Sequence, residues 1–103
     1  MTVGPAADAT AEQTTAIGEV AWRRIVRVEG RVRDVRVRPW QGGGFALECA
    51  VFDDTGGVTL VFLGRTQIGG ITLGRRLQAV GMVSENRERL VILNPTYTLL
   101  QAS

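Results

Sequence analysis

The sequence predicts an all-β barrel of five short strands, and three observations support this fold class. Apolar and polar residues alternate with a period of two in five segments that begin at Ile25. Turns rich in glycine, aspartate and asparagine separate these segments. Neither residues 1–16 nor Gly64–Gly74 shows the regular apolar spacing of a helix. Several short strands joined by such turns are typical of a barrel.

The first predicted strand starts at Ile25 and changes phase partway along. Val28 and Val32 lie on one face in its first half, and Val35 and Val37 become the apolar partners after a shift of one residue. A phase change inside one strand indicates a bulge. A long strand that bends at a bulge can serve both halves of a closed barrel.

Four further strands and a closing segment follow. We expect them at Phe45–Phe52, Val58–Leu63, Arg76–Val83 and Arg89–Leu93, with Thr96–Leu100 as a short extended tail. The residues from Asp53 to Gly57 predict a tight hairpin turn, and those from Ser84 to Glu88 predict another. Because Gly64–Gly74 is interrupted by glycine, we expect a 3₁₀ turn and a connector there.

The chain length and composition predict one domain with a short tail. Residues 1–16 are small and polar, which predicts a flexible N-terminal tail before a domain over residues 17–103. No apolar run approaches the ~18 residues of a membrane span, and no secretory signal pattern is present, so we expect no membrane partner. The single cysteine, Cys49, excludes an internal disulfide and predicts a cytoplasmic protein.

The residues that most enzymes use are scarce, so we do not expect an enzyme. The absence of histidine removes the commonest general base and metal ligand, and leaves Cys49 without an activating partner. Asp53 and Asp54, with Glu48 nearby, are more typical of a turn than of a metal site. Gly42–Gly44 lacks the Lys-Ser/Thr that would follow in a phosphate-binding loop. We therefore expect no metal and no cofactor.

Positive charge is concentrated in one part of the chain. The net charge is +2, but all 12 basic residues are arginines that follow residue 20, and seven of them lie within residues 23–38. Arginine binds phosphate through two parallel hydrogen bonds and stacks on bases, whereas lysine does neither. A genome rich in G and C is the better explanation of the lack of lysine itself, but it does not explain the clustering.

Several motifs occur along residues 17–100 in an informative order. They are Val28-Glu29-Gly30-Arg31-Val32, the segment from Asp53 to Phe62, Leu73-Gly74 with Leu77 to Val83, and Leu90 to Leu93. This order resembles the OB-fold nucleic-acid-binding superfamily, in particular its anticodon-binding and RecG-wedge modules. The end Asn94-Pro95-Thr96-Tyr97 is similar to that of small stand-alone actinobacterial OB-fold proteins. The resemblance implies a five-stranded Greek-key OB barrel with a short or missing helix between strands three and four.

The resemblance also implies where a ligand would lie. In this fold the ligand crosses strands two and three, between the loop joining strands one and two and the loop joining strands four and five. Strand alternation predicts that Phe52, Val61 and Leu63 face outwards there. Stacked bases would cover such an apolar surface, and so would the tail, a second copy of the chain or a partner protein.

The candidate binding residues are mainly arginines. Arg36 and Arg38 lead into Trp40 on the first loop, and Arg87 and Arg89 lie at the opposing loop. A basic strand end next to an aromatic residue is typical of a surface that follows a phosphate backbone and stacks a base. Trp40 fits a base platform and a plug beneath the loop equally well, whereas we expect Trp22 to be structural. The full nucleic-acid-binding set is Arg31, Arg33, Arg36, Arg38, Trp40, Phe52, Val61, Arg65, Arg87 and Arg89.

The sequence thus favours a module that binds single-stranded DNA or RNA through an arginine-rich groove with aromatic stacking. The alternative is a protein–protein interaction or assembly module, including a homodimer, that uses the exposed sheet face. In a third reading, individual arginines are solvated and paired with Glu29, Asp34, Glu85 or Glu88. Binding that weakens with salt would distinguish the first of these from the others.

Overall fold

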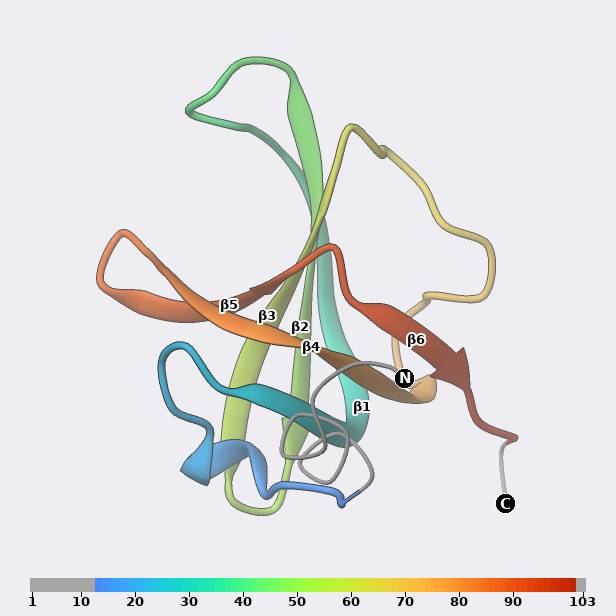
Figure 1. The fold of residues 1–103 in the computed structure, drawn as a ribbon. Coiled ribbons are helices and arrows are strands. Elements are labelled where there is room, and N and C mark those ends of the chain that lie inside the picture. The colour runs from blue at the N-terminus through green and yellow to red at the C-terminus, as the bar shows by residue number, and fades with distance from the viewer. Residues whose placement is uncertain (1–12, 102–103) are drawn as a thin grey trace, which may run out of the picture.

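The computed structural model describes residues 13–101 as a closed β-barrel (Figure 1). Its elements are the 3₁₀ helix η1 (Ile17–Glu19) and the strands β1 (Ile25–Pro39), β2 (Phe45–Asp53), β3 (Gly56–Leu63), β4 (Arg76–Asn86), β5 (Arg89–Leu93) and β6 (Thr96–Leu99). The ring runs β1-β2-β3-β5-β4 and closes through a β1–β4 pairing. Only β3 and β5 pair in parallel among these strands. The predicted five-stranded Greek-key barrel is confirmed, and the segment between β3 and β4 contains no helix.

The first strand serves both halves of the barrel because it is bulged. Its first part, Ile25–Arg31, pairs with β4, and its later part pairs with β2 up to Pro39. The register with β2 shifts between Val32 and Asp34, which confirms the bulge predicted from the phase change. Gly30 lies where the strand bends, and a Cβ atom there would come within 2.5 Å of the Phe52 carbonyl oxygen. Only glycine fits this close approach of two strands.

The connector between β3 and β4 covers one end of the barrel. Ile68 and Ile71 are buried in the core, and the Ile71 N–H donates to the Ile68 carbonyl. The 3₁₀ turn expected in Gly64–Gly74 is absent from this described segment, which forms turns instead. Gly70 and Gly74 have φ angles of 87° and 86°, and such left-handed residues interrupt a helical course.

The β4–β5 hairpin is longer than the sequence indicated. β4 continues to Asn86 instead of ending at Val83, and the turn consists of Arg87 and Glu88 alone. Both turn residues have positive φ angles, 54° and 67°. A two-residue turn of this kind matches the twist of the strands on either side, so pairing continues up to the turn.

Buried apolar residues form a main cluster inside the ring and a small cluster outside it. Leu60, Leu77 and Ile92 are among the fully buried residues of the main cluster. The small cluster consists of Ala46, Val61 and Val91, with Trp40 and Leu93 packed against it. The prediction that Val61 is exposed is therefore wrong. Val61 does point away from the barrel interior, but the loop between β1 and β2 brings Trp40 over it.

A segment before β1 is fastened to the turn between β2 and β3. The Ile17 N–H donates to Asp53 Oδ2 at 2.9 Å, and the Gly18 N–H donates to Thr55 Oγ1 at 2.7 Å. The Thr15 N–H donates to the Arg27 carbonyl at 2.7 Å. Residues 1–12 of the expected tail lie outside the described residues. Within the described chain, no helix is long and apolar enough to span a bilayer.

Candidate functional site

The outer surface of β2 and β3 is set by their register. Glu48, Ala50 and Phe52 point outwards from β2 and pair with Val61, Thr59 and Gly57 of β3. Beyond its bulge, β1 extends this surface, because Asp34, Arg36 and Arg38 pair with Ala50, Glu48 and Ala46. We call this three-stranded surface the outer face. Three hollows lie along it.

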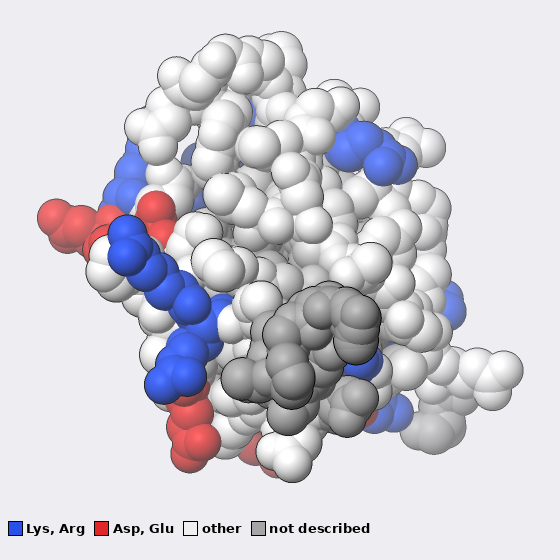
Figure 2. Space-filling view, in the orientation of Figure 1, with Lys and Arg blue, Asp and Glu red and all other residues white. Residues whose placement is uncertain are grey.

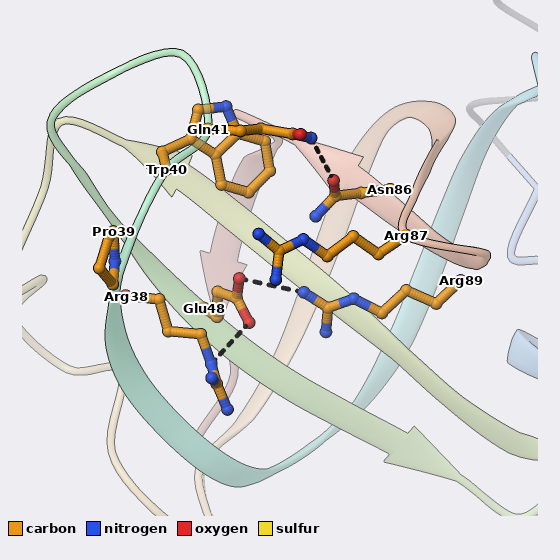
Figure 3. A pocket seen from close by; sticks show the side chains of 8 residues that line it. All are labelled: Arg38, Pro39, Trp40, Gln41, Glu48, Asn86, Arg87 and Arg89. Carbon is orange, nitrogen blue, oxygen red and sulfur yellow. Dashed lines mark hydrogen bonds and ion pairs between the residues drawn. The ribbon is translucent and has the colours of Figure 1, made fainter.

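The first hollow lies between the β1–β2 loop and the β4–β5 turn, and we call it the Trp40 hollow (Figure 3). Its volume is about 200 Å³. A hydrogen bond of 2.8 Å from Gln41 Nε2 to Asn86 Oδ1 joins the β1–β2 loop to the end of β4. The lining residues are Arg38, Pro39, Trp40, Gln41, Glu48, Asn86, Arg87 and Arg89.

A buried carboxylate forms part of the Trp40 hollow. Glu48 is only 8% exposed, and its Oε2 accepts a hydrogen bond of 3.0 Å from Arg89 Nη2. Its Oε1 lies 3.5 Å from Arg38 Nε. Figure 3 shows that these two arginines approach Glu48 from different strands, while the Arg87 side chain extends into the same hollow. With three arginines and one carboxylate, the hollow carries a net positive charge.

The second hollow is more apolar, and we call it the Leu90 hollow. Its volume is about 440 Å³, and Arg89 separates it from the Trp40 hollow because this side chain lines both. The segment fastened to the β2–β3 turn forms one wall. The lining residues are Ile17, Gly18, Val20, Ala50, Phe52, Gly56, Gly57, Val58, Thr59, Arg89 and Leu90.

The third hollow lies on the far side of Phe52, and we call it the Arg31 hollow. Its volume is about 380 Å³, and its lining is charged: Glu29, Gly30, Arg31, Arg33, Phe52, Asp53, Asp54 and Arg76. The Phe52 ring lies over Gly57, where a Cβ atom would come within 2.4 Å of it. The Arg33 guanidinium carbon is 5.2 Å from the centre of that ring, a cation–π distance. Phe52 is 36% exposed, as predicted.

The three hollows follow one another along the outer face. Arg89 belongs to the first and second, and Phe52 belongs to the second and third. We call the resulting depression the outer track. Figure 2 shows a largely uncharged surface in this orientation, with charges of both signs gathered toward the side where the β4–β5 hairpin lies in Figure 1.

The structure brings together most of the predicted site residues but not all. Those that line the outer track are Arg31, Arg33, Arg38, Trp40, Phe52, Arg87 and Arg89. Arg36 instead forms an ion pair of 2.6 Å with Asp34, and Arg65 lines none of the three hollows. Val61 is buried. Trp40 packs on the small cluster and also lines the Trp40 hollow, and its role as a base platform stays a prediction.

Sequence reasoning missed two parts of the site and misjudged Trp22. From the sequence, Glu48 was considered only as part of a metal site next to Asp53 and Asp54. Strand alternation also places Glu48 on the outward side of β2 between Ala46 and Ala50, which was the available signal for its position in the site. The wall formed by Ile17–Val20 gave no signal, because it depends on hydrogen bonds to a turn 36 residues away. Trp22 is 54% exposed and pairs with Arg23 at 4.4 Å, so it does not belong to the core.

Two groups near the outer track have shifted pKa values. Burial raises the pKa of the Asp53 carboxyl, but hydrogen bonds from Ile17, Thr55 and Gly56 outweigh burial and hold this pKa below its usual 3.8. Burial, reinforced by the charge of Asp34, raises the pKa of the Cys49 thiol to about 12. The Cys49 side chain is therefore a protonated core residue at neutral pH, and thiols in this state are poor nucleophiles.

Comparison with known proteins identifies the fold. No protein-family model matches the sequence, and no curated protein matches it either. Among solved structures, the chain resembles the second OB-fold domain of replication protein A from Methanococcus maripaludis. That match has a TM-score of 0.64 and 15% identity, and it covers 88% of this chain and 98% of that domain.

Two HIN domains are also similar. The p204 HINb domain matches with a TM-score of 0.65 and 17% identity over 97% of this chain, and the tetrameric p202 HIN2 with 0.66 and 16% over 86%. This chain spans only about half the length of those structures, 53% and 50%. At such low identity the likeness concerns the fold alone. The closed strand ring and these neighbours together show that this chain has the OB fold.

Proposed function

We propose that this chain binds single-stranded nucleic acid along the outer track and performs no catalysis of its own. The observation that carries this proposal is that three adjoining hollows form one track, which is lined by arginines and by the rings of Trp40 and Phe52. The Trp40 hollow lies between the β1–β2 and β4–β5 loops, and the other two follow the outer face along β2, and OB folds bind oligonucleotides on these loops and this face. A cytoplasmic location, expected from the single cysteine, goes with this proposal.

The arginines of the outer track supply the phosphate contacts in this proposal. Arg33, Arg87 and Arg31 are exposed, and their guanidinium groups lie at the two ends of the track. Among residues 13–101 the structure gives Arg87 no ion-pair partner. A phosphate bound there displaces only water and counterions, which is the usual source of affinity for a nucleic-acid backbone.

The aromatic residues favour an unpaired strand over a duplex. Phe52 is exposed between two hollows, and a base that stacks on its ring contributes about 1–3 kcal/mol. Bases within a duplex are stacked on each other and cannot reach a platform set into a barrel surface. In the bound state we expect a base to replace the Arg33 guanidinium over Phe52, which frees Arg33 for phosphate.

A binding titration tests the proposal directly. Fluorescence anisotropy with labelled decamers of DNA and RNA, as single strands and as duplexes, should show tighter binding of the single strands. Phosphate contacts by Arg31, Arg33 and Arg87, at about −0.7 each, predict a slope of roughly −2 for log affinity against log salt. Heparin should compete. No binding of any single strand at 20 mM salt would refute the proposal.

Two arginines provide a matched pair of variants. Arg87→Gln removes one cation from the outer track and should weaken binding several-fold, with a salt slope shallower by about 0.7. Arg65→Gln removes the same charge from an exposed residue that lines none of the three hollows. It should leave both quantities within error. Equal effects of the two variants would indicate attraction by net charge rather than a defined track.

A protein-interaction module remains a second candidate, because apolar side chains are exposed away from the outer track. Val37 and Phe45 are 46% and 54% exposed. By register both lie on the opposite side of the β1–β2 hairpin from Arg38. Sedimentation over a range of protein concentrations should reveal self-association, and Phe45→Ser should abolish it. Such association would persist at high salt, unlike nucleic-acid binding.

A further inference from the structure

We infer that Glu48 makes the Trp40 hollow a base-reading pocket that prefers a base with an exocyclic amino group, such as cytosine, over uracil. This inference rests on the proposed function, because it assigns one position along a bound strand. It starts from an unusual feature of an otherwise cationic hollow: the carboxylate of Glu48 lines it, between Arg38 and Arg89.

Glu48 has acceptor capacity left for a ligand. A carboxylate offers about four lone-pair positions. Arg89 Nη2 takes up one on Oε2 at 3.0 Å, and Arg38 Nε approaches Oε1 at 3.5 Å. The two arginines flank the carboxylate and fix its position. Arg89 Nη1 in turn donates a hydrogen bond of 3.3 Å to Thr59 Oγ1. A donor group entering the hollow therefore meets an acceptor of fixed position.

The charge of Glu48 determines which part of a nucleotide enters. A phosphate placed beside a nearly buried carboxylate is repelled, whereas the exposed Arg87 at the rim attracts it. The base is the part of the nucleotide that carries N–H donors and a flat face. Trp40 lines the same hollow and offers a wall on which that face can pack. The base should thus point inwards, with its phosphate at the rim.

The carboxylate also distinguishes between the two pyrimidines. Cytosine presents an N4 amino group, a donor that carboxylates accept, whereas uracil presents a carbonyl oxygen at the same position. Uracil has an N–H donor at N3, but this group lies between two carbonyl oxygens, so a uracil that donates it to Glu48 brings both oxygens close to the carboxylate, which repels them. Cytosine carries its N4 amino group at one end of the same edge and its single carbonyl oxygen, O2, at the other end.

Decamers of cytidine and uridine test this inference, because the two bases have the same size. At pH 7.5 and equal salt, the wild-type protein should bind the cytidine decamer about tenfold more tightly. Glu48→Gln should bring the ratio close to one, because a glutamine amide presents a donor or an acceptor as needed. Glu85→Gln is the matched control: Glu85 pairs with Leu90 and so lies on the other face of the β4–β5 hairpin from Arg89. It should keep the tenfold ratio.

The outcomes separate this inference from the proposed function. If the two decamers bind the wild type equally, or if Glu48→Gln keeps the ratio, Glu48 does not read the base, although the binding proposal stands. If neither decamer binds, both proposals fail. Should Glu48→Gln not fold, a decamer of N4,N4-dimethylcytidine decides with the wild type alone. Lacking the amino donors, it should bind like uridine, and binding as tight as cytidine would overturn the inference.

Discussion

The two ends of the outer face differ in how their apolar side chains are covered. At one end, Val61 points outwards but is fully buried, because Trp40 and Leu93 close over it. At the other end, Phe52 also points outwards and remains 36% exposed, with only glycine opposite it on β3. The cluster of Glu48, Arg38 and Arg89 lies at the first of these ends, because Glu48 pairs with Val61 across β2 and β3.

This difference shows that a loop, rather than the strands, decides where a ligand has room. The β1–β2 loop folds back over one end of the face and converts a potential contact surface into packing. Within residues 13–101 no loop covers the Phe52 end, where the segment around Ile17 forms a wall instead of a lid. One end of the face therefore gains packing beneath the loop and keeps only the charged Trp40 hollow for a ligand, whereas the other end keeps an apolar surface available for binding.

The largest expected effect is on stability and concerns the covered end, where Trp40 packs over Val61. Trp40→Ala should lower the free energy of unfolding by about 2 kcal/mol, since it removes the cover of Val61 and leaves a gap. Trp22→Ala, at the other and more exposed tryptophan, should change it by less than about 0.5 kcal/mol. Urea denaturation of both variants measures the contrast. Equal losses would mean that Trp40 contributes no more packing than a surface residue.

The next effect is on binding and concerns the open end of the outer face, where Phe52 is exposed. Phe52→Ala should weaken oligonucleotide binding about tenfold or more, given about 1–3 kcal/mol for a stacked base. Its cost in stability should stay near 1 kcal/mol, because the ring is partly exposed. Phe45→Ala is the control, as an exposed phenylalanine outside the three hollows. If Phe45→Ala weakens binding as much, the open end is not where bases stack.

A smaller effect concerns the wall of the open end. The pKa of Asp53 is lowered in the folded protein, so its charge stabilises the fold above about pH 3.8, and this contribution is lost as the pH falls through the lowered pKa. Asp53→Asn should therefore lower the free energy of unfolding at pH 7, by no more than about 1 kcal/mol because solvent screens this partly exposed carboxylate, and by progressively less below pH 3.8. Stability curves from pH 7 to pH 2 measure this. Asp54→Asn, at the exposed neighbour, should follow the wild type throughout.

The smallest effect is on the reactivity of Cys49, which lies inside the barrel. Because the pKa of Cys49 is raised to about 12, its thiol should not react with a thiol reagent at pH 8 in the native protein. In 8 M urea one thiol should react quickly. Rapid labelling of the native protein would show that the barrel readily exposes the inner side of β2, where Cys49 lies.

The sequence allowed the strands, the bulge and the orientation of most side chains to be predicted, because these follow from period-two alternation. The phase of this alternation between apolar and polar residues was enough to show that β1 bends near Arg33 and that Phe52 points outwards. It did not show that Val61 is covered, because this depends on the path of a glycine-rich loop over the face. The pairing of Glu48 with Arg89 was equally inaccessible, because 41 residues separate them and only the closed ring brings them together.

The ring is held most weakly where β3 meets β5. Only three residue pairs join these strands, from Thr59–Val91 to Val61–Leu93, and Asn94 extends the seam by bonding to both Val61 and Leu63. A local fluctuation should therefore separate β3 from β5 before it breaks any other strand pairing of the ring, which would convert the closed barrel into an open, curved sheet. Trp40 packs against the small cluster, to which Val61 of β3 and Val91 of β5 belong, so a nucleic-acid strand bound in the Trp40 hollow should hold the two β-strands together. Amide hydrogen exchange at the seam should therefore slow when the nucleic acid binds.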